Sequence, residues 1–236
     1  MRWILSLLAA CVPGECRGGR LSWRRRCALA ATAMAGATLM MTVAARPAPQ
    51  SPTSPVPERF FALFHVLNNG SHVGEARWTL EPVDGGRFEL RSVTEARGLW
   101  SLLLAGERVE RSLWTWRDGR PAPLEYRYTW TGRKARDVKV VFDWEEGVVH
   151  NVHGEDRWTL EVEPGTQDKF LYLLELMHDL ARGAADLRYT IADGGKLKEY
   201  AAVRLGRESL ETPLGPLETV KLRRSAPRGK RTTTLW

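Results

Sequence analysis

Cysteine is missing from most of this sequence. The three cysteines, Cys11, Cys16 and Cys27, all lie in the N-terminal 27 of its 236 residues. A chain cut after residue 45 contains no thiol. A disulfide scaffold, a thiolate metal site and a cysteine nucleophile are therefore excluded together for such a chain.

Familiar catalytic motifs are missing as well. The sequence has no Gly-x-Ser-x-Gly, no glycine-rich loop that opens a helix and no His-Glu-x-x-His. The adjacent acids at residues 145–146 and 155–156 fall in predicted turns, where charge is usually solvated. We therefore expect a protein without enzymatic activity and without a cofactor.

Net charge is nearly absent from the body of the protein. The formal net charge is +7, but residues 1–45 hold six arginines against a single acid, Glu15. The remaining residues carry 29 basic and 27 acidic side chains. Because strong positive charge is the usual mark of nucleic-acid binding, we expect no nucleic-acid partner.

Two basic groups nevertheless lie in or beside predicted turns: Arg133, Lys134, Arg136 and Lys139, and then Arg223, Arg224, Arg228, Lys230 and Arg231. Charge runs in turns are normally exposed to solvent. The functional alternative is peripheral contact with a membrane, where each basic residue would add about 1 kcal/mol of attraction to anionic headgroups.

Residues 1–45 are predicted to be a signal or targeting segment. A basic run at 24–26 precedes an uncharged apolar stretch over 27–43, and small residues follow at 43–45. This order is typical of a secretory signal and predicts an exported, periplasmic protein. A retained membrane anchor is the alternative, because about 17 apolar residues is the lower limit for spanning a bilayer.

The same segment leaves further alternatives open. Leu8-Ala9-Ala10-Cys11 resembles a lipoprotein cleavage box, which would attach the mature chain to lipid through Cys11. The arginine triplet resembles a twin-arginine signal, although the expected apolar residue behind the pair is missing. A start codon further downstream would account equally well for residues 1–22.

Residues 46–58 are predicted to be a proline-rich linker. Five prolines are interleaved there with serine, threonine and glutamine. Proline at every second or third position denies the backbone both a helix and a strand ladder. We therefore expect a single β-rich domain over residues 59–236.

The dominant pattern in this domain has a period of two. Apolar and polar residues alternate over 124–130, 138–144, 158–162 and 219–223, as in strands with one dry face. Turn signals separate the strands at residues 68–70, 84–86, 118–119, 146–147 and 193–195. Short loops between consecutive strands require antiparallel pairing.

One segment has helical spacing instead. Apolar residues recur over 169–182, Thr166 or Asp168 is placed to cap the first turn, and Gly183 follows the end. The apolar arc is so wide that the helix must be covered on more than one side. Its narrow polar edge comprises Glu175, His178, Asp179 and Arg182. The short apolar run over 98–104 predicts a loop or a single helical turn at the edge of the sheet.

Histidine offers no clear metal site. His150 and His153 are three residues apart on a predicted strand, so their side chains point to opposite faces. His65 and His72 flank the first hairpin without a visible partner. We therefore expect no metal.

Several segments together resemble the bacterial envelope family known as domain of unknown function 3108: residues 68–76, 95–100, 164–168, 193–200 and 211–222. The resemblance extends over most of residues 60–236. It implies an exported protein with a strongly curved antiparallel sheet, similar to the half-barrel of lipoprotein carrier and receptor proteins of the outer membrane. The family pattern continues past a position like Trp236, so we expect that a C-terminal strand is missing. No catalytic residue can be transferred.

The expected fold is mainly β: a strongly curved antiparallel sheet, as a half-barrel or β-roll, with one helix packed on its concave face. The expected function is non-catalytic binding of a hydrophobic or lipid-like ligand in the groove of this sheet. The aromatic and helical residues expected to line the groove are Trp114, Trp116, Tyr126, Tyr128, Trp130, Phe142, Trp144, Trp158, Phe170, Leu173 and Met177.

Three alternatives stay open. The same aromatic residues are typical of an ordinary core, which is the more common arrangement, since large aromatics dominate core energetics. The protein is otherwise an envelope interaction or assembly factor that holds a protein partner through a sheet edge or its basic turns. An enzyme would require a cleft with paired acids, or an acid and a histidine within hydrogen-bond reach.

Overall fold

The computed structural model describes residues 3–10, 56–68, 71–103, 106–133, 135–212, 214–225 and 232–236. All of them belong to one compact unit made of residues 1–12 and 55–236. Most of the predicted signal segment and the linker up to residue 55 lie outside the described residues.

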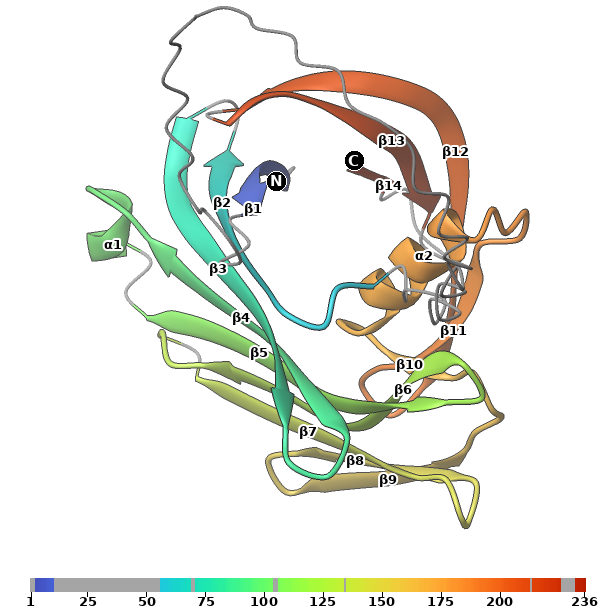
Figure 1. Ribbon diagram of the computed structural model, residues 1–236. Coiled ribbons are helices and arrows are strands. Elements are labelled where there is room, and N and C mark those ends of the chain that lie inside the picture. Colours follow the sequence, from blue (N-terminus) through green and yellow to red (C-terminus); the bar gives the residue numbers. More distant parts are fainter. Residues whose placement is uncertain are drawn as a thin grey trace, which may run out of the picture. The chain divides into compact units, whose positions relative to one another are not determined.

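The first nine strands form one sheet in which every strand pairs antiparallel with its neighbour in the sequence. The sheet curves strongly, as Figure 1 shows. Its strands are β1 (Trp3–Ala10), β2 (Phe60–Asn68), β3 (Ser71–Val83), β4 (Arg87–Ala96), β5 (Glu107–Arg117), β6 (Arg120–Trp130), β7 (Arg136–Asp143), β8 (Val148–His153) and β9 (Asp156–Glu161).

Tight turns explain this topology. Between β5 and β6, Asp118 and Gly119 have φ values of 51° and 73°. Two successive residues with positive φ make the turn that matches the twist of a two-residue hairpin. The predicted hairpin signal is confirmed here, and the alternation over 124–130 and 138–144 is confirmed by β6 and β7.

The remaining strands form a second sheet, where the sequence predicted a single one. It contains β10 (Gln167–Asp168), β11 (Arg188–Ala192), β12 (Leu197–Thr212), β13 (Gly215–Ser225) and β14 (Thr232–Leu235). Strand β10 pairs parallel with β11, and the other pairs are antiparallel. The second sheet begins before the helix: β10 follows β9 directly, α2 (Tyr172–Ala181) comes next, and β11 then pairs with β10.

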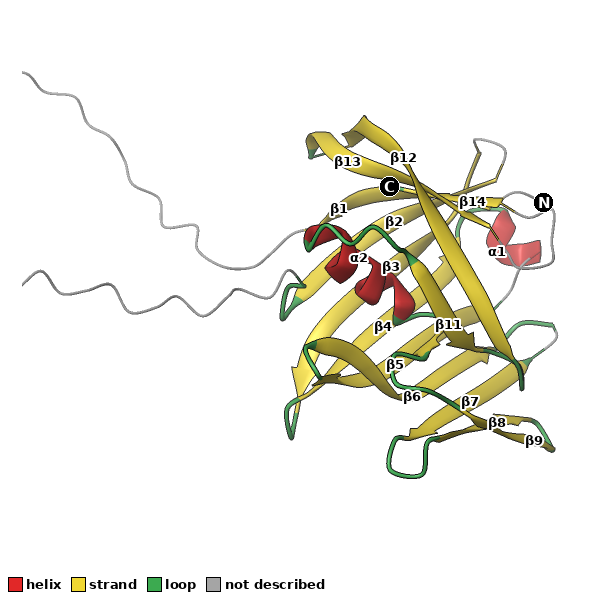
Figure 2. Ribbon diagram, turned by 90° about the vertical axis from the view of Figure 1, so that its right-hand side faces the viewer, coloured by secondary structure: helices red, strands yellow, loops and turns green. Residues whose placement is uncertain are grey.

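Helix α2 is covered on two sides, as its wide apolar arc predicted. Leu171 and Leu174 belong to the main core with Trp114 of the first sheet. Tyr172 and Leu176 pack into a second cluster with side chains of β11 and β13. Figure 2 shows α2 beside β11, on the side of the curved sheet that faces the second sheet. The predicted fold class, mainly β with a curved antiparallel sheet and one packed helix, is confirmed.

A second, very short helix, α1 (Trp100–Leu103), lies between β4 and β5. It is the single helical turn that the apolar run over 98–104 predicted. Figure 1 shows it standing outside the curve of the sheet, away from α2.

Candidate functional site: an apolar loop beside a basic turn

Most of the predicted ligand-binding residues fill the core. Trp114 and Tyr126 are 1% exposed, Phe142 is 5% exposed and Phe170 is 3% exposed, and all four belong to one packed cluster. Four more pack against that cluster as partly buried side chains: Trp116, Tyr128, Trp144 and Leu173. Side chains that are enclosed by their neighbours leave little surface for a ligand. This part of the concave side is filled by protein.

Two predicted residues are exposed. Met177 is 46% exposed and Trp158 is 37% exposed, and their role in ligand binding stays a prediction. Trp158 lies on β9, the last strand of its sheet, and its ring stands close to Gly195, where an added Cβ would come within 2.7 Å of it. The remaining residue, Trp130, is half-buried at the end of β6.

Met177 is exposed because α2 buries the edge that was expected to be polar and solvated. Glu175, His178 and Asp179 are all at most 5% exposed. Arg120, at the start of β6, reaches this edge: its Nε lies 3.1 Å from Glu175 Oε1, and its Nη2 donates to Asp179 Oδ1 at 2.6 Å. Arg120 and Glu175 are 55 residues apart in the sequence, so the local pattern does not reveal their ion pair. This pair orients α2 with Glu175 inward and Met177 outward.

The electrostatics of this cluster follow from its burial. Burial raises the pKa of Glu175 to about 7, against the opposing charge of Arg120. Burial also lowers the pKa of His178 below its ordinary value, although Asp179 opposes this. The Tyr189 hydroxyl donates to Asp179 Oδ2 at 3.1 Å. These contacts fasten α2 to both sheets.

A second buried acid prepares the start of α2. Asp168 is fully buried, and its Oδ1 accepts hydrogen bonds from the backbone N–H groups of Phe170 and Leu171, both at 2.7 Å. The Ser112 hydroxyl donates to Oδ2 at 2.5 Å. Burial nevertheless raises the pKa of Asp168 to about 6. Of the two predicted capping residues, Asp168 is the one that binds the turn leading into the helix.

Two hollows among the described residues lie next to predicted ligand-binding residues. One, of about 200 Å³, is lined by Tyr128, Trp158 and Lys169 among others. The other, of about 160 Å³, is lined by Arg120, Trp144 and Gln167 among others. Both are smaller than the roughly 300 to 1,000 Å³ that is usual for a drug-sized ligand. Each touches only one or two of the predicted residues.

The two most exposed of the large apolar side chains that the structure describes, Leu99 and Leu102, instead lie in the loop between β4 and β5. Leu99 is 81% exposed, Leu102 is 78% exposed and Trp100 is 37% exposed. The loop is held in shape, because the Ser101 backbone N–H and hydroxyl both donate to the carbonyl of Gly98, at 3.1 and 2.7 Å. We call residues 98–103 the apolar loop. Contiguous exposed apolar residues of this kind mark interaction surfaces.

A basic turn, residues 131–133 after β6, lies at the same end of the sheet as the apolar loop. It contacts the residue that precedes β5: a Cβ on Gly106 would come within 2.4 Å of the Gly132 nitrogen. The Thr131 N–H also donates to the Glu107 carbonyl at 3.1 Å. The turn carries Arg133, which is exposed and forms no ion pair within the described part of the chain. The antiparallel topology thus places cationic and apolar side chains at the same end of the sheet.

The other predicted basic residues are placed differently. Arg136 is exposed, and its Nε contacts His153 Nε2 at 3.3 Å. Lys139 forms an ion pair with Glu125 at 2.9 Å. Arg224 donates to the Tyr172 hydroxyl and to Thr233, while Arg223 is exposed. Lys134, Arg228, Lys230 and Arg231 lie outside the described residues.

Sequence reasoning located the apolar loop but gave it no role. The signal was present, because six consecutive residues from Leu99 to Leu104 contain five apolar side chains between two predicted strands. A run of that length does not alternate and is too short for a confident helix, so its pattern alone indicates neither a buried nor an exposed position. Its exposure follows from the position of α1 in the connection between β4 and β5.

A family model described as "Protein of unknown function (DUF3108)" matches residues 63–236. No curated protein matches the chain. No solved structure matches it either, so the likeness to lipoprotein carriers stays a prediction. Within the described residues, no helix is long and apolar enough to cross a membrane.

Proposed function

We propose that this chain, which belongs to the DUF3108 family of unknown function, is a non-catalytic, periplasmic lipid-binding protein. In this proposal the apolar loop enters the surface of an anionic membrane, and the basic turn at the same end of the sheet contacts the headgroups. The ligand is lipid-like, as the sequence predicted, but it contacts the rim of the sheet, because protein side chains fill the core.

The exposure of Leu99 and Leu102 carries the proposal. Burying a leucine side chain that is otherwise exposed is worth about 1.5 to 3 kcal/mol. Leu99 and Leu102 are 81% and 78% exposed. Moving both side chains from water into hydrocarbon would therefore contribute several kcal/mol to membrane binding. Trp100 is between them, and tryptophan is enriched at the membrane interface because its ring is apolar and its N–H is polar.

Charge favours a lipid over a protein as the occupant. Arg133 lies on the basic turn, at the same end of the sheet as the apolar loop, and forms no ion pair among the residues described; Arg136 is exposed at the start of β7. Each basic residue near an anionic surface contributes about 1 kcal/mol. Exposed apolar side chains and exposed arginines at one end of the sheet complement a layer of anionic headgroups over hydrocarbon.

Vesicle sedimentation tests this proposal. The protein is expressed with its own N-terminal segment and recovered from the periplasmic extract, as the cell processes it. We expect the wild type to sediment with vesicles of phosphatidylglycerol and phosphatidylethanolamine. The double substitution Leu99→Ser with Leu102→Ser should reduce the bound fraction at least tenfold, because it removes the apolar contact.

The matched control is Leu214→Ser, since Leu214 is also an exposed hairpin leucine, at 61% exposure, but lies between β12 and β13. It should bind like the wild type. Equal binding by wild type and loop variant would contradict the proposal. A second contradicting outcome has two parts. The wild type does not bind vesicles, and it forms a crosslink to one dominant envelope protein that is lost in the loop variant. That result would favour the assembly-factor hypothesis instead.

A further inference from the structure

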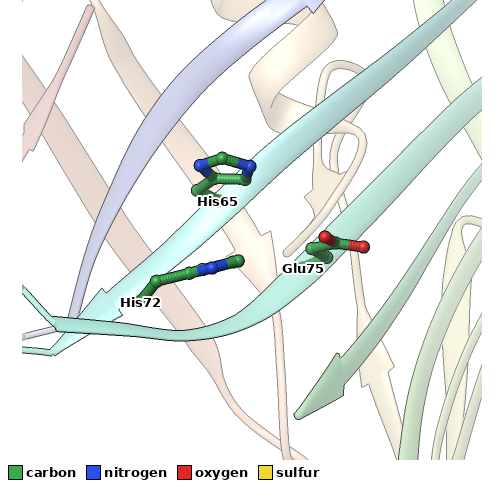
Figure 3. A group of neighbouring side chains, drawn as sticks. All are labelled: His65, His72 and Glu75. Atoms are coloured by element: carbon green, nitrogen blue, oxygen red, sulfur yellow. The ribbon is translucent and has the colours of Figure 1, made fainter. Parts of the chain in front are cut away.

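Two histidines that had no visible partner in the sequence meet on the hairpin of β2 and β3. The rings of His65 and His72 have their centroids 4.3 Å apart. Glu75 joins them, so that one ligand atom from each of the three side chains lies within 4.8 Å of the other two. Figure 3 shows the three side chains gathered on these adjacent strands.

Strand register explains why they converge. His65 is the direct cross-strand partner of Glu75, and such partners have Cβ atoms about 4.5 to 5.5 Å apart. His72 and Glu75 are three residues apart, which in a regular strand would place them on opposite faces. The ladder is shifted here: Val66 pairs with Gly74 and Leu67 with His72, so that Val73 is an extra residue. This bulge restores His72 to the face of Glu75.

The donor set is suited to a transition metal. Two imidazoles and one carboxylate are ligands that Zn²⁺ accepts, usually with water in the fourth position. Calcium, in contrast, takes six to eight oxygen ligands, which this site does not offer. Because the three ligand atoms lie within 4.8 Å of one another, an ion placed among them lies at most about 2.8 Å from each. The side chains therefore need to close by at most roughly 0.7 Å to reach Zn–N distances of about 2.0 to 2.1 Å.

Neighbouring groups hold the carboxylate in place for this role. Arg97 donates to Glu75 Oε2 through Nε at 3.1 Å and through Nη2 at 2.7 Å. Glu75 Oε1 accepts no hydrogen bond from the described residues and is available to an ion. A partner that orients a ligating carboxylate in this way is usual around metal sites.

From this geometry we propose that His65, His72 and Glu75 form a binding site for one divalent transition-metal ion such as Zn²⁺. The site is independent of the proposed lipid binding. His72 is exposed and His65 and Glu75 are half-buried, so the ion reaches them from solvent, and His72 is free to move during closure.

The experiment measures Zn²⁺ binding by equilibrium dialysis of the untagged full chain. Cys11, Cys16 and Cys27 are replaced by serine in every variant, because thiolates bind zinc themselves. We expect one ion per chain. His72→Ala should weaken binding at least tenfold without loss of the fold, since this side chain is exposed. Glu75→Gln keeps an oxygen for Arg97 but removes the anionic ligand, and should also weaken binding.

The control pair is His150→Ala and His153→Ala. These histidines are also three residues apart on a strand, but the ladder of β8 with β7 and β9 has no register shift, so their side chains face opposite ways. Their variants should bind zinc like the parent chain. The absorption spectrum of bound Co²⁺ provides a second readout. Sub-stoichiometric binding, or binding that His72→Ala leaves unchanged, would overturn the proposal.

Discussion

Glu175 and Asp168 are acids that folding removes from water. Burial raises the pKa of Glu175 from 4.5 to about 7 and that of Asp168 from 3.8 to about 6. Between its unfolded and its folded pKa, each acid is protonated in the native state and ionised in the unfolded chain. Their contribution to stability is therefore fully present below the unfolded pKa and is lost as the pH rises through the folded pKa. The pKa of His178 is lowered, so its contribution to stability is present above the unfolded pKa and is lost as the pH falls through the folded pKa.

The substitution Glu175→Gln should remove one part of this pH dependence. Between pH 4.5 and 7 the free energy of unfolding of the wild type should fall relative to that of the variant, by on the order of 3 kcal/mol. Urea unfolding followed by fluorescence at several pH values gives this difference. Glu81→Gln, at an exposed acid, is the control and should run parallel to the wild type. Parallel curves for Glu175→Gln would show that burial does not perturb this acid.

Helix α2 illustrates how an element is oriented by its contacts. Its sequence predicts an apolar arc that includes Met177, yet the structure exposes Met177 and buries Glu175 and Asp179. The reason is Arg120, which pairs with both acids from the first sheet. The helix therefore contributes Leu174 to the main core, where it is 1% exposed.

Two alanine substitutions on α2 test this orientation. Leu174→Ala should destabilise the protein by about 2 to 5 kcal/mol, because it removes a fully buried leucine and leaves a cavity. Met177→Ala should change the free energy of unfolding by less than about 0.5 kcal/mol, as is usual for exposed positions. Denaturant unfolding of both variants is sufficient. If Met177→Ala lowered the free energy of unfolding as much as Leu174→Ala, Met177 would point inward as the sequence predicted.

At the scale of the whole molecule, the antiparallel meander brings loops that are far apart in sequence to one end of the sheet. The apolar loop and the turn that carries Arg133 both lie at this end, and Gly132 of the turn contacts Gly106 just before β5. Under the proposed function, the attraction of this end to a membrane has an apolar and an electrostatic part. Only the electrostatic part depends on salt, since the screening length falls from about 10 Å at 0.1 M to about 3 Å at 1 M.

Arg133→Glu should separate the two parts. Reversing this charge should lower binding to anionic vesicles by roughly ten- to thirtyfold at low salt, at about 1 kcal/mol for each unit of charge. Binding to neutral phosphatidylcholine vesicles should not change. Arg91→Glu, at an exposed arginine within β4, is the control for the change in net charge. A loss of the same size in Arg91→Glu would mean that net charge, and no particular surface, attracts the membrane.

The sequence by itself determined the local elements of this protein. Alternation over 124–130 and 138–144 specifies strands, Asp118 and Gly119 specify a tight turn, and the helical spacing over 169–182 specifies α2. These features are local, because period and turn chemistry act within a few residues. The same pattern also identified the residues of the main core, though not whether they enclose a ligand.

Only the tertiary structure decided which side chains meet. Arg120 orients α2 through an ion pair with Glu175, 55 residues away in the sequence, and the antiparallel pairing of β4 to β7 places the apolar loop and the basic turn at one end of the sheet. The bulge at Val73 gathers His65, His72 and Glu75 although their spacing argues against a shared face. Each of these depends on strand register and on packing between distant segments, which a periodic pattern in one segment does not specify.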